Sequence, residues 1–167
     1  MATSYLGIKE GALSGGKELH GQLMALRDGL APKLIRSALV DAVKPTLGLW
    51  RAGMAKGSVP HRTYKGRLVG PGFSQRNAYI SSGISRDKTK ASATVGPKDE
   101  AFYNVWFLET VGFTGGRGKR GRRRGRKVEP RPVLEPVFKA TRGVMLSTLI
   151  SALRRRVDKA VAQGKAR

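Results

Sequence analysis

The chain of 167 residues contains no cysteine and only two histidines, His20 and His61. Without cysteine it has no disulfides and no thiol chemistry, and two histidines far apart in the sequence do not make a zinc site with nearby ligands. Acidic residues are also few, 11 against 33 lysines and arginines. Because no convergent set of titratable groups can be assembled, we expect no enzyme, no metal site and no cofactor.

Long apolar runs are missing too. The longest nearly apolar stretch, Val144 to Leu153, is too short to span a bilayer, and Met1 to Glu10 lacks the features of a signal peptide. We therefore expect a soluble protein without membrane contact, of a size that fits one domain with its own core. The expected divisions are an arm at 1–16, a domain at 17–162 with a basic loop at 113–128, and a basic tail at 163–167.

What the chain has in excess is positive charge, with a formal net charge of +22. Between Arg117 and Lys127, eight of eleven residues are cations and the other three are glycines. This run cannot form core, since it has nothing apolar to bury against the entropy of ordering it. Without its eight charges the chain would still carry +14, so the basicity is global and favours acidic partners.

The glycine-arginine run allows three interpretations. Its arginines could dock on carboxylates of an acidic protein, it could neutralise phosphates of a nucleic acid, or it could be a solvated loop. Gly116 to Gly121 spells GxGxxG, but neither flank provides the strand and helix of a dinucleotide loop. The candidate contacts to a partner or to DNA are Arg117, Lys119, Arg120, Arg122, Arg123, Arg124, Arg126 and Lys127.

Apolar spacing predicts two helices in the N-terminal third. The first is marked by leucines at spacings of four, three and four, namely Leu19, Leu23, Leu26 and Leu30. Asp28-Gly29 supplies a stop, and Pro32 suits the first turn of the second helix. That helix continues from Leu34 to Trp50, and Pro45 within it should produce a kink or the start of a new helix.

Alternation predicts a hairpin after a connector at Gly53 to Gly72. The two strands are Ala78 to Ser85 and Thr89 to Val95, joined by Arg86-Asp87-Lys88. One face of the hairpin should carry Ile80, Ser82, Ile84, Ala91, Ala93 and Val95. The connector's cations should lie at the surface, and these are Lys56, Arg62, Lys65 and Arg67.

Glu100 to Thr110 has a periodicity that fits either a helix or a strand. Its aromatic residues should contribute to the core, and they are Phe102, Tyr103, Trp106 and Phe107. Trp50 and Trp106 could stack bases, but their helical spacing among apolar residues favours core or subunit contacts. Glu109 should pair with an arginine or cap a backbone group, which we favour over a chemical role.

The last helix begins among three prolines, Pro130, Pro132 and Pro136. Its expected apolar stripe consists of Leu134, Val137, Phe138, Val144, Met145, Leu149, Leu153 and Val157. The stripe should pack with the aromatic segment and hold the cationic run outward as a hairpin-like excursion. The expected fold class is α+β, with two N-terminal helices, a small antiparallel sheet and a long C-terminal helix.

The order of these motifs resembles the tail-component family of long-tailed bacteriophages, also called the tail-completion or neck family. The resemblance covers roughly Leu19 to Val161. Upstream, a helix with Ala42, Lys44 and Pro45 precedes Arg62, Thr63, Gly66, Arg67 and Leu68. Downstream, Tyr103, Phe107, Leu108, Glu109 and Gly112 precede Arg131, Pro132, Leu134, Pro136 and Phe138. Tyr64 and Lys65 are inserted in the Arg-Thr-Gly pattern, and the arginine run is longer than the family's loop.

The resemblance implies a siphophage virion protein at the head-tail junction, with a short helix running into an extended segment at Glu100 to Thr110. It implies a hexameric ring whose partners are tail terminator or tail tube proteins, head-tail connector proteins and the leading end of the virion DNA, with assembly in the host cytoplasm. The residues expected to pack between subunits are Tyr103, Trp106, Phe107, Glu109, Leu134 and Phe138. The alternative is a basic module that binds DNA or RNA through the glycine-arginine run.

Overall fold

A computed structural model describes residues 16–26, 30–54, 56, 60–63, 65–98, 101–106, 109–110, 113–114 and 127–164. The helices are α1 (Gly16–Met24), α2 (Leu30–Gly53), α3 (Phe73–Asn77), α4 (Phe102–Trp106) and α5 (Leu134–Ala162). The strands are β1 (His61–Arg62), β2 (Leu68–Val69), β3 (Ala78–Ile84), β4 (Ala91–Pro97), β5 (Phe113–Thr114) and β6 (Lys127–Val128). The fold is α+β, as predicted. The N-terminal arm lies almost wholly outside the described residues.

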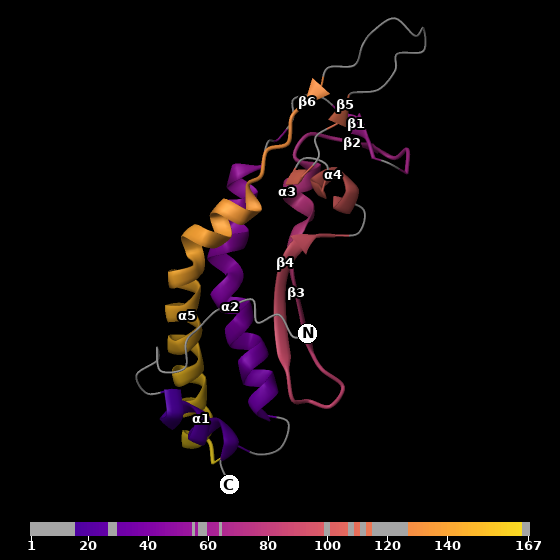
Figure 1. Ribbon diagram of the computed structural model, residues 1–167. Coiled ribbons are helices and arrows are strands. Elements are labelled where there is room, and N and C mark those ends of the chain that lie inside the picture. Colours follow the sequence, from indigo (N-terminus) through magenta and orange to yellow (C-terminus); the bar gives the residue numbers. More distant parts are fainter. Residues whose placement is uncertain are drawn as a thin grey trace, which may run out of the picture.

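The long helices α2 and α5 run antiparallel, side by side, and the β3–β4 hairpin lies along the other side of α2 (Figure 1). α2 therefore occupies the middle layer of three. Its buried positions recur every four residues, at Ala38, Ala42, Thr46 and Trp50. The helix is continuous through Pro45, so the alternative in which a new helix begins there is wrong.

α5 buries a line of side chains against α2, and this line differs in part from the predicted stripe. Thr141, Met145 and Ala152 are buried, whereas Phe138 and Val144 are exposed. Successive residues lie about 100° apart around a helix, so Val144 points well away from its buried neighbour Met145. Phe138 and Val144, which belong to the predicted stripe, are therefore not part of the buried line.

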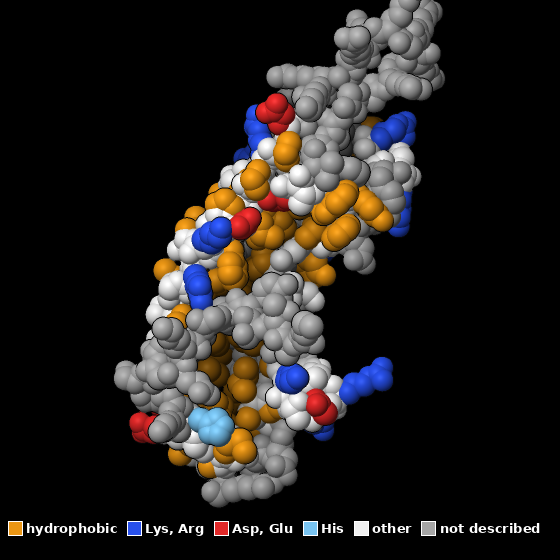
Figure 2. Space-filling view, in the orientation of Figure 1, with side chains coloured by type: hydrophobic (Ala, Val, Ile, Leu, Met, Phe, Trp, Pro, Cys, Tyr) orange, Lys and Arg blue, Asp and Glu red, His pale blue; other side chains and the backbone are white. Residues whose placement is uncertain are grey.

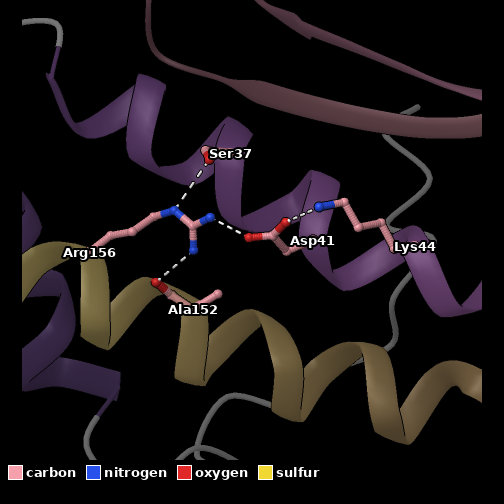
Figure 3. A network of polar contacts seen from close by, with 5 residues as sticks. All are labelled: Ser37, Asp41, Lys44, Ala152 and Arg156. Atoms are coloured by element: carbon pink, nitrogen blue, oxygen red, sulfur yellow. Dashed lines mark hydrogen bonds and ion pairs between the residues drawn. The ribbon is translucent and has the colours of Figure 1, made fainter.

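Polar contacts fix α2 and α5 relative to each other. The hydroxyls of Thr46 and Thr141 are hydrogen-bonded at 2.8 Å in the buried interface. Nearer the C-terminal end of α5, the Arg156 guanidinium forms an ion pair with Asp41 and also donates hydrogen bonds to Ser37 and to the Ala152 carbonyl (Figure 3). Hydrogen bonds from Lys44 and then Arg156 lower the pKa of Asp41 below its ordinary value.

The β3–β4 hairpin has the predicted faces. Its register pairs Ile80 with Val95, Ser82 with Ala93 and Ile84 with Ala91, so these six residues share one face. That face packs on α2, which contacts both strands. The turn is longer than predicted, because β4 begins at Ala91 rather than at Thr89.

The connector contains the two-stranded β1–β2 ladder, and the short helix α3 follows directly after it; the sequence indicated neither. Its four cations are exposed, as predicted. The main core cluster gathers at this end of the molecule around Trp50, whose side chain is 0% exposed, together with Phe73, Ala101 and Val105. Two smaller clusters follow the α2–α5 contact toward α1. Within the described part of the chain, no helix has the length and apolar character needed to cross a membrane.

Candidate interaction site

The site is built on a carboxylate junction between three distant parts of the chain. One oxygen of Glu109 accepts a hydrogen bond from Trp50 Nε1 at 2.9 Å. The other accepts from the backbone N–H groups of Val133 and Leu134 at 2.6 and 3.1 Å, at the first turn of α5. A carboxylate there satisfies N–H groups that have no partner within the helix and faces the positive end of the helix dipole.

This geometry confirms the structural interpretation of Glu109, which caps backbone groups. It also explains why a charged residue follows the aromatic segment. Glu109 connects the end of that segment to the start of the last helix and to the buried face of α2. Glu109 and Thr110 lie in a π-type turn, and the Thr110 hydroxyl donates to the Trp106 carbonyl at 2.7 Å. Extended backbone is reached at Phe113.

α4 presents two different faces. Ala101, just before it, and Val105 are buried in the main core cluster, against which Val133, Leu134 and Val137 also pack. The large aromatic residues lie on the other face: Phe102 is 49% exposed, and Tyr103 and Trp106 are each 42% exposed. The prediction that these three residues contribute to the core is wrong, because the residues of this segment that enter the main core cluster are Ala101 and Val105.

The exposed aromatic residues form a patch, which we call the α4 face (Phe102, Tyr103 and Trp106). Trp106 follows Phe102 by four residues and Tyr103 by three, so the three side chains share one side of the helix. The rings of Phe102 and Tyr103 meet edge to face, with centroids 5.5 Å apart and planes at 88°. Figure 2 shows apolar side chains at the surface in the region of α4 and α5.

Close to the α4 face, β5 and β6 form the stem of the predicted excursion. Phe113 pairs with Val128 and Thr114 with Lys127, in antiparallel register. This pairing shows that the chain leaves the domain and returns to it at one place. Between the paired residues lie twelve residues, all glycine, arginine or lysine. Those residues, and hence all the predicted cationic contacts except Lys127, lie outside the described part of the chain.

The remaining residues predicted to pack between subunits fall in different places. Leu134 is half-buried and packs against the main core of its own subunit. Phe138 is exposed on α5, where a partner could reach it. Phe107 lies outside the described residues. Their packing between subunits therefore stays a prediction, together with that of Tyr103, Trp106 and Glu109.

Most of the acidic side chains that the structure describes take part in contacts within the chain. Among the described residues, Asp41, Asp87, Glu109 and Glu135 accept hydrogen bonds or ion pairs from the chain itself. Three others, Glu18, Glu129 and Asp158, are exposed and scattered. The described part of the chain has no group of three histidine or acidic side chains arranged to hold a metal ion. Its surface is therefore dominated by lysine and arginine.

Comparison with known proteins adds no relative: no protein-family model matches the chain, and no curated protein or solved structure matches it significantly. The resemblance to the tail-component family rests on the quoted residues alone and stays a prediction. The class that the fold and the site define is a basic α+β domain with an exposed aromatic face.

Proposed function

We propose that this chain is a structural virion protein that completes or joins the tail at the head-tail junction of a long-tailed phage. The observation that carries the proposal is the α4 face, three large aromatic side chains nearly half exposed beside a rigid junction. Such residues are enriched where proteins contact each other, and exposed apolar patches of this kind mark interaction sites. The motif order that resembles the tail-component family supports the same role.

The fold suits a subunit that presents contacts at a fixed orientation. Glu109 fastens the segment that follows α4 to both long helices, so a partner that docks on the α4 face meets a preorganised surface. In a hexameric ring, the α4 face of one copy would contact a different surface of the next, which is the heterologous arrangement that closes into rings.

Charge determines what the ring needs for its assembly. Copies that each carry +22 repel one another, so a ring forms most readily when an acidic surface or DNA neutralises them. The glycine-arginine run is the natural counterpart for a neighbouring tail terminator, tail tube or connector protein, or for the leading DNA end. The stem that returns the chain to the same place supports this role.

One test changes the α4 face. We expect Tyr103→Ser with Trp106→Ser to leave the subunit folded and to reduce its incorporation into virions, since the exposed rings contribute more to association than to folding. The control is Met24→Ser with Leu68→Ser, which removes two side chains that are 73% and 63% exposed elsewhere. Equal incorporation of both variants would contradict the proposed role of the α4 face.

A second test changes the run. Replacement of Arg122, Arg123 and Arg124 by Ala should leave the subunit folded but produce heads and tails that fail to join. Electron microscopy of lysates and plaque counts measure this directly. Unchanged infectivity would exclude a role for the run in joining.

The second candidate function is a nucleic-acid-binding module, favoured by the global charge and by the engagement of four described carboxylates within the fold. Under this hypothesis the purified monomer binds nucleic acid tightly, and its affinity falls steeply with salt. Tight binding by a protein that is absent from virions favours this second function, whereas incorporation into virions favours the structural role.

A further inference from the structure

The turn of the β3–β4 hairpin, at the end of the hairpin far from α4, combines high charge with a fixed shape. Arg86, Lys88 and Lys90 are all exposed there. Figure 2 shows lysine and arginine side chains at this turn, one of which projects clear of the body. We call these three residues the hairpin tip. It lies far from the α4 face and was not among the predicted contact sites.

Hydrogen bonds inside the turn hold its shape. Asp87 accepts from the Ser85 hydroxyl at 2.5 Å, and from the backbone N–H and the hydroxyl of Thr89 at 3.1 and 2.7 Å. The Lys90 N–H donates to the Ser85 hydroxyl at 2.9 Å. These bonds, from Ser85 first and then Thr89, lower the pKa of Asp87 to about 2. The only acid of the turn accepts its hydrogen bonds from neutral donors, and its single negative charge faces three positive charges, so the turn keeps a net positive charge for an external partner.

The outer face of the hairpin, opposite to α2, carries Tyr79 at the end far from the tip and is small and polar from there to the tip. The register places Ser81 beside Thr94 and Gly83 beside Ser92 on this face, and the serines and the threonine are exposed. Neither an apolar nor an acidic side chain stands there between these pairs and the tip. Hydroxyl groups of this kind donate hydrogen bonds to phosphate oxygens.

Two glycines lie on the outer face, Gly83 opposite Ser92 and Gly96 opposite Tyr79. A β-carbon at Gly83 would only touch the Ser92 hydroxyl at 3.9 Å, and one at Gly96 would meet nothing within 4 Å. Neither has a positive φ. Glycine in a strand costs about 0.5–1 kcal/mol relative to alanine, and it often marks a place where another molecule approaches the backbone closely.

From this combination we infer that the hairpin tip and the outer face of β3–β4 bind the phosphate backbone of duplex DNA. Protein interfaces depend on buried aromatic or aliphatic anchors, and the tip has none. Binding to single strands depends on a series of aromatic rings that stack on successive bases, whereas the outer face has a single one, Tyr79, at the end far from the tip. A two-stranded ribbon also has a width that the major groove admits. This contact goes beyond the proposed virion role and does not depend on ring formation.

The test uses the purified full-length protein and a short DNA duplex in a fluorescence anisotropy titration over a range of salt. The tip variant is Arg86→Gln, Lys88→Asn, Lys90→Gln. Asparagine is chosen at 88 because Lys88 has φ 58°, a conformation that asparagine tolerates. The control, Arg142→Gln, Arg155→Gln, Lys159→Gln, removes the same charge from exposed positions of α5, across α2 from the hairpin.

We expect the tip variant to lower the salt slope by up to about 2.7, since each lost phosphate contact contributes roughly 0.9, and to weaken binding at least about tenfold at low salt. The control variant should change the salt slope and the affinity at low salt much less. Equal losses in the two variants would overturn the inference, because they would show a response to net charge alone. A tip variant that loses binding to polyglutamate but not to duplex would also overturn it, in favour of an acidic protein partner.

Two variants that leave the charge unchanged test whether the shape of the outer face matters for duplex binding. Gly83→Val adds bulk to the outer face and should weaken duplex binding about tenfold without lowering the melting temperature. Ser82→Val adds similar bulk to the inner face, where Ser82 pairs with Ala93, and should leave binding unchanged. If Gly83→Val binds duplex as the unmodified protein does, the outer face is not part of the contact and the inference fails.

Discussion

The junction at Glu109 and the turn at Asp87 use the same device in two different environments. In each, a carboxylate accepts hydrogen bonds from neighbouring donors and fixes a local conformation. Glu109 is half-buried and joins segments 59 and 24 residues apart, whereas Asp87 is exposed and joins residues two apart. The comparison teaches that burial and sequence separation, rather than the number of bonds, decide whether such a carboxylate supports the whole domain or only a turn.

The most damaging change should be to the partner of Glu109. Trp50→Ala removes a fully buried indole from the main core, and we expect it to lower the free energy of unfolding by about 3–5 kcal/mol. Urea unfolding followed by circular dichroism measures this. Trp50→Phe keeps most of the bulk but removes the donor to Glu109, so it should cost less. If the two variants were equally destabilised, the hydrogen bond rather than the packing would be the main contribution.

Loss of the carboxylate itself should come next. Glu109→Ala leaves the Trp50 indole N–H and the backbone N–H groups of Val133 and Leu134, at the start of α5, without their acceptor, and should cost about 3 kcal/mol. Glu129→Ala removes an exposed acid and should stay within about 0.5 kcal/mol of the unmodified protein. A Glu109→Ala variant as stable as the Glu129→Ala control would show that the junction does not hold the domain together.

The ion pair between Asp41 of α2 and Arg156 of α5 should make an intermediate contribution to stability. Asp41→Asn should cost about 1 kcal/mol, because Arg156 keeps its bonds to Ser37 and Ala152. Since the folded-state pKa of Asp41 is lowered, its contribution is present above pH 3.8 and is lost as the pH falls through the lower folded value. Thermal unfolding between pH 3 and pH 6 should therefore converge for the two proteins toward the acid end. Asp158→Asn, at an exposed position, serves as the control.

The smallest effect on the domain should come from Asp87. Asp87→Asn should leave the melting temperature unchanged and speed hydrogen exchange at the Thr89 amide, which loses its charged acceptor. The pKa of Asp87 is lowered to about 2, so the charged acceptor persists below pH 3.8 and is lost as the pH falls through about 2. NMR spectra of the turn recorded over this range measure the midpoint. A midpoint near 3.8 would show that the turn is not held by these bonds.

The hairpin and the long helices could be predicted because their signals are local. Alternation from Ile80 to Val95 is enough to assign the faces of two adjacent strands, and the four-residue spacing up to Trp50 identifies the buried side of α2. The sequence located the turn between the two strands, but it did not indicate the conformation of that turn. Its hydrogen bonds depend on the rotamers of Ser85 and Thr89, which the residue pattern does not fix.

The aromatic segment was predicted less well. The periodicity fitted a helix or a strand, and the resemblance to the tail-component family implied the short helix that is found at Phe102 to Trp106. Apolar character led to the expectation that the large rings are buried, whereas three of them are exposed. Five residues make little more than one turn, so nothing in the pattern decides which side meets the core. The partners of Glu109 lie in other elements, and only the packing of those elements brings them together.

By itself, the sequence determined the long helices, the two faces of the main hairpin, the excess of positive charge and a run that cannot be buried, because propensity, alternation and composition act over a few neighbouring residues. Only the tertiary structure decided that Ala101 and Val105 rather than the aromatic rings enter the core. It also decided that Glu109 closes the junction with Trp50 and the start of α5, since the space left between three packed elements is a property of the whole fold.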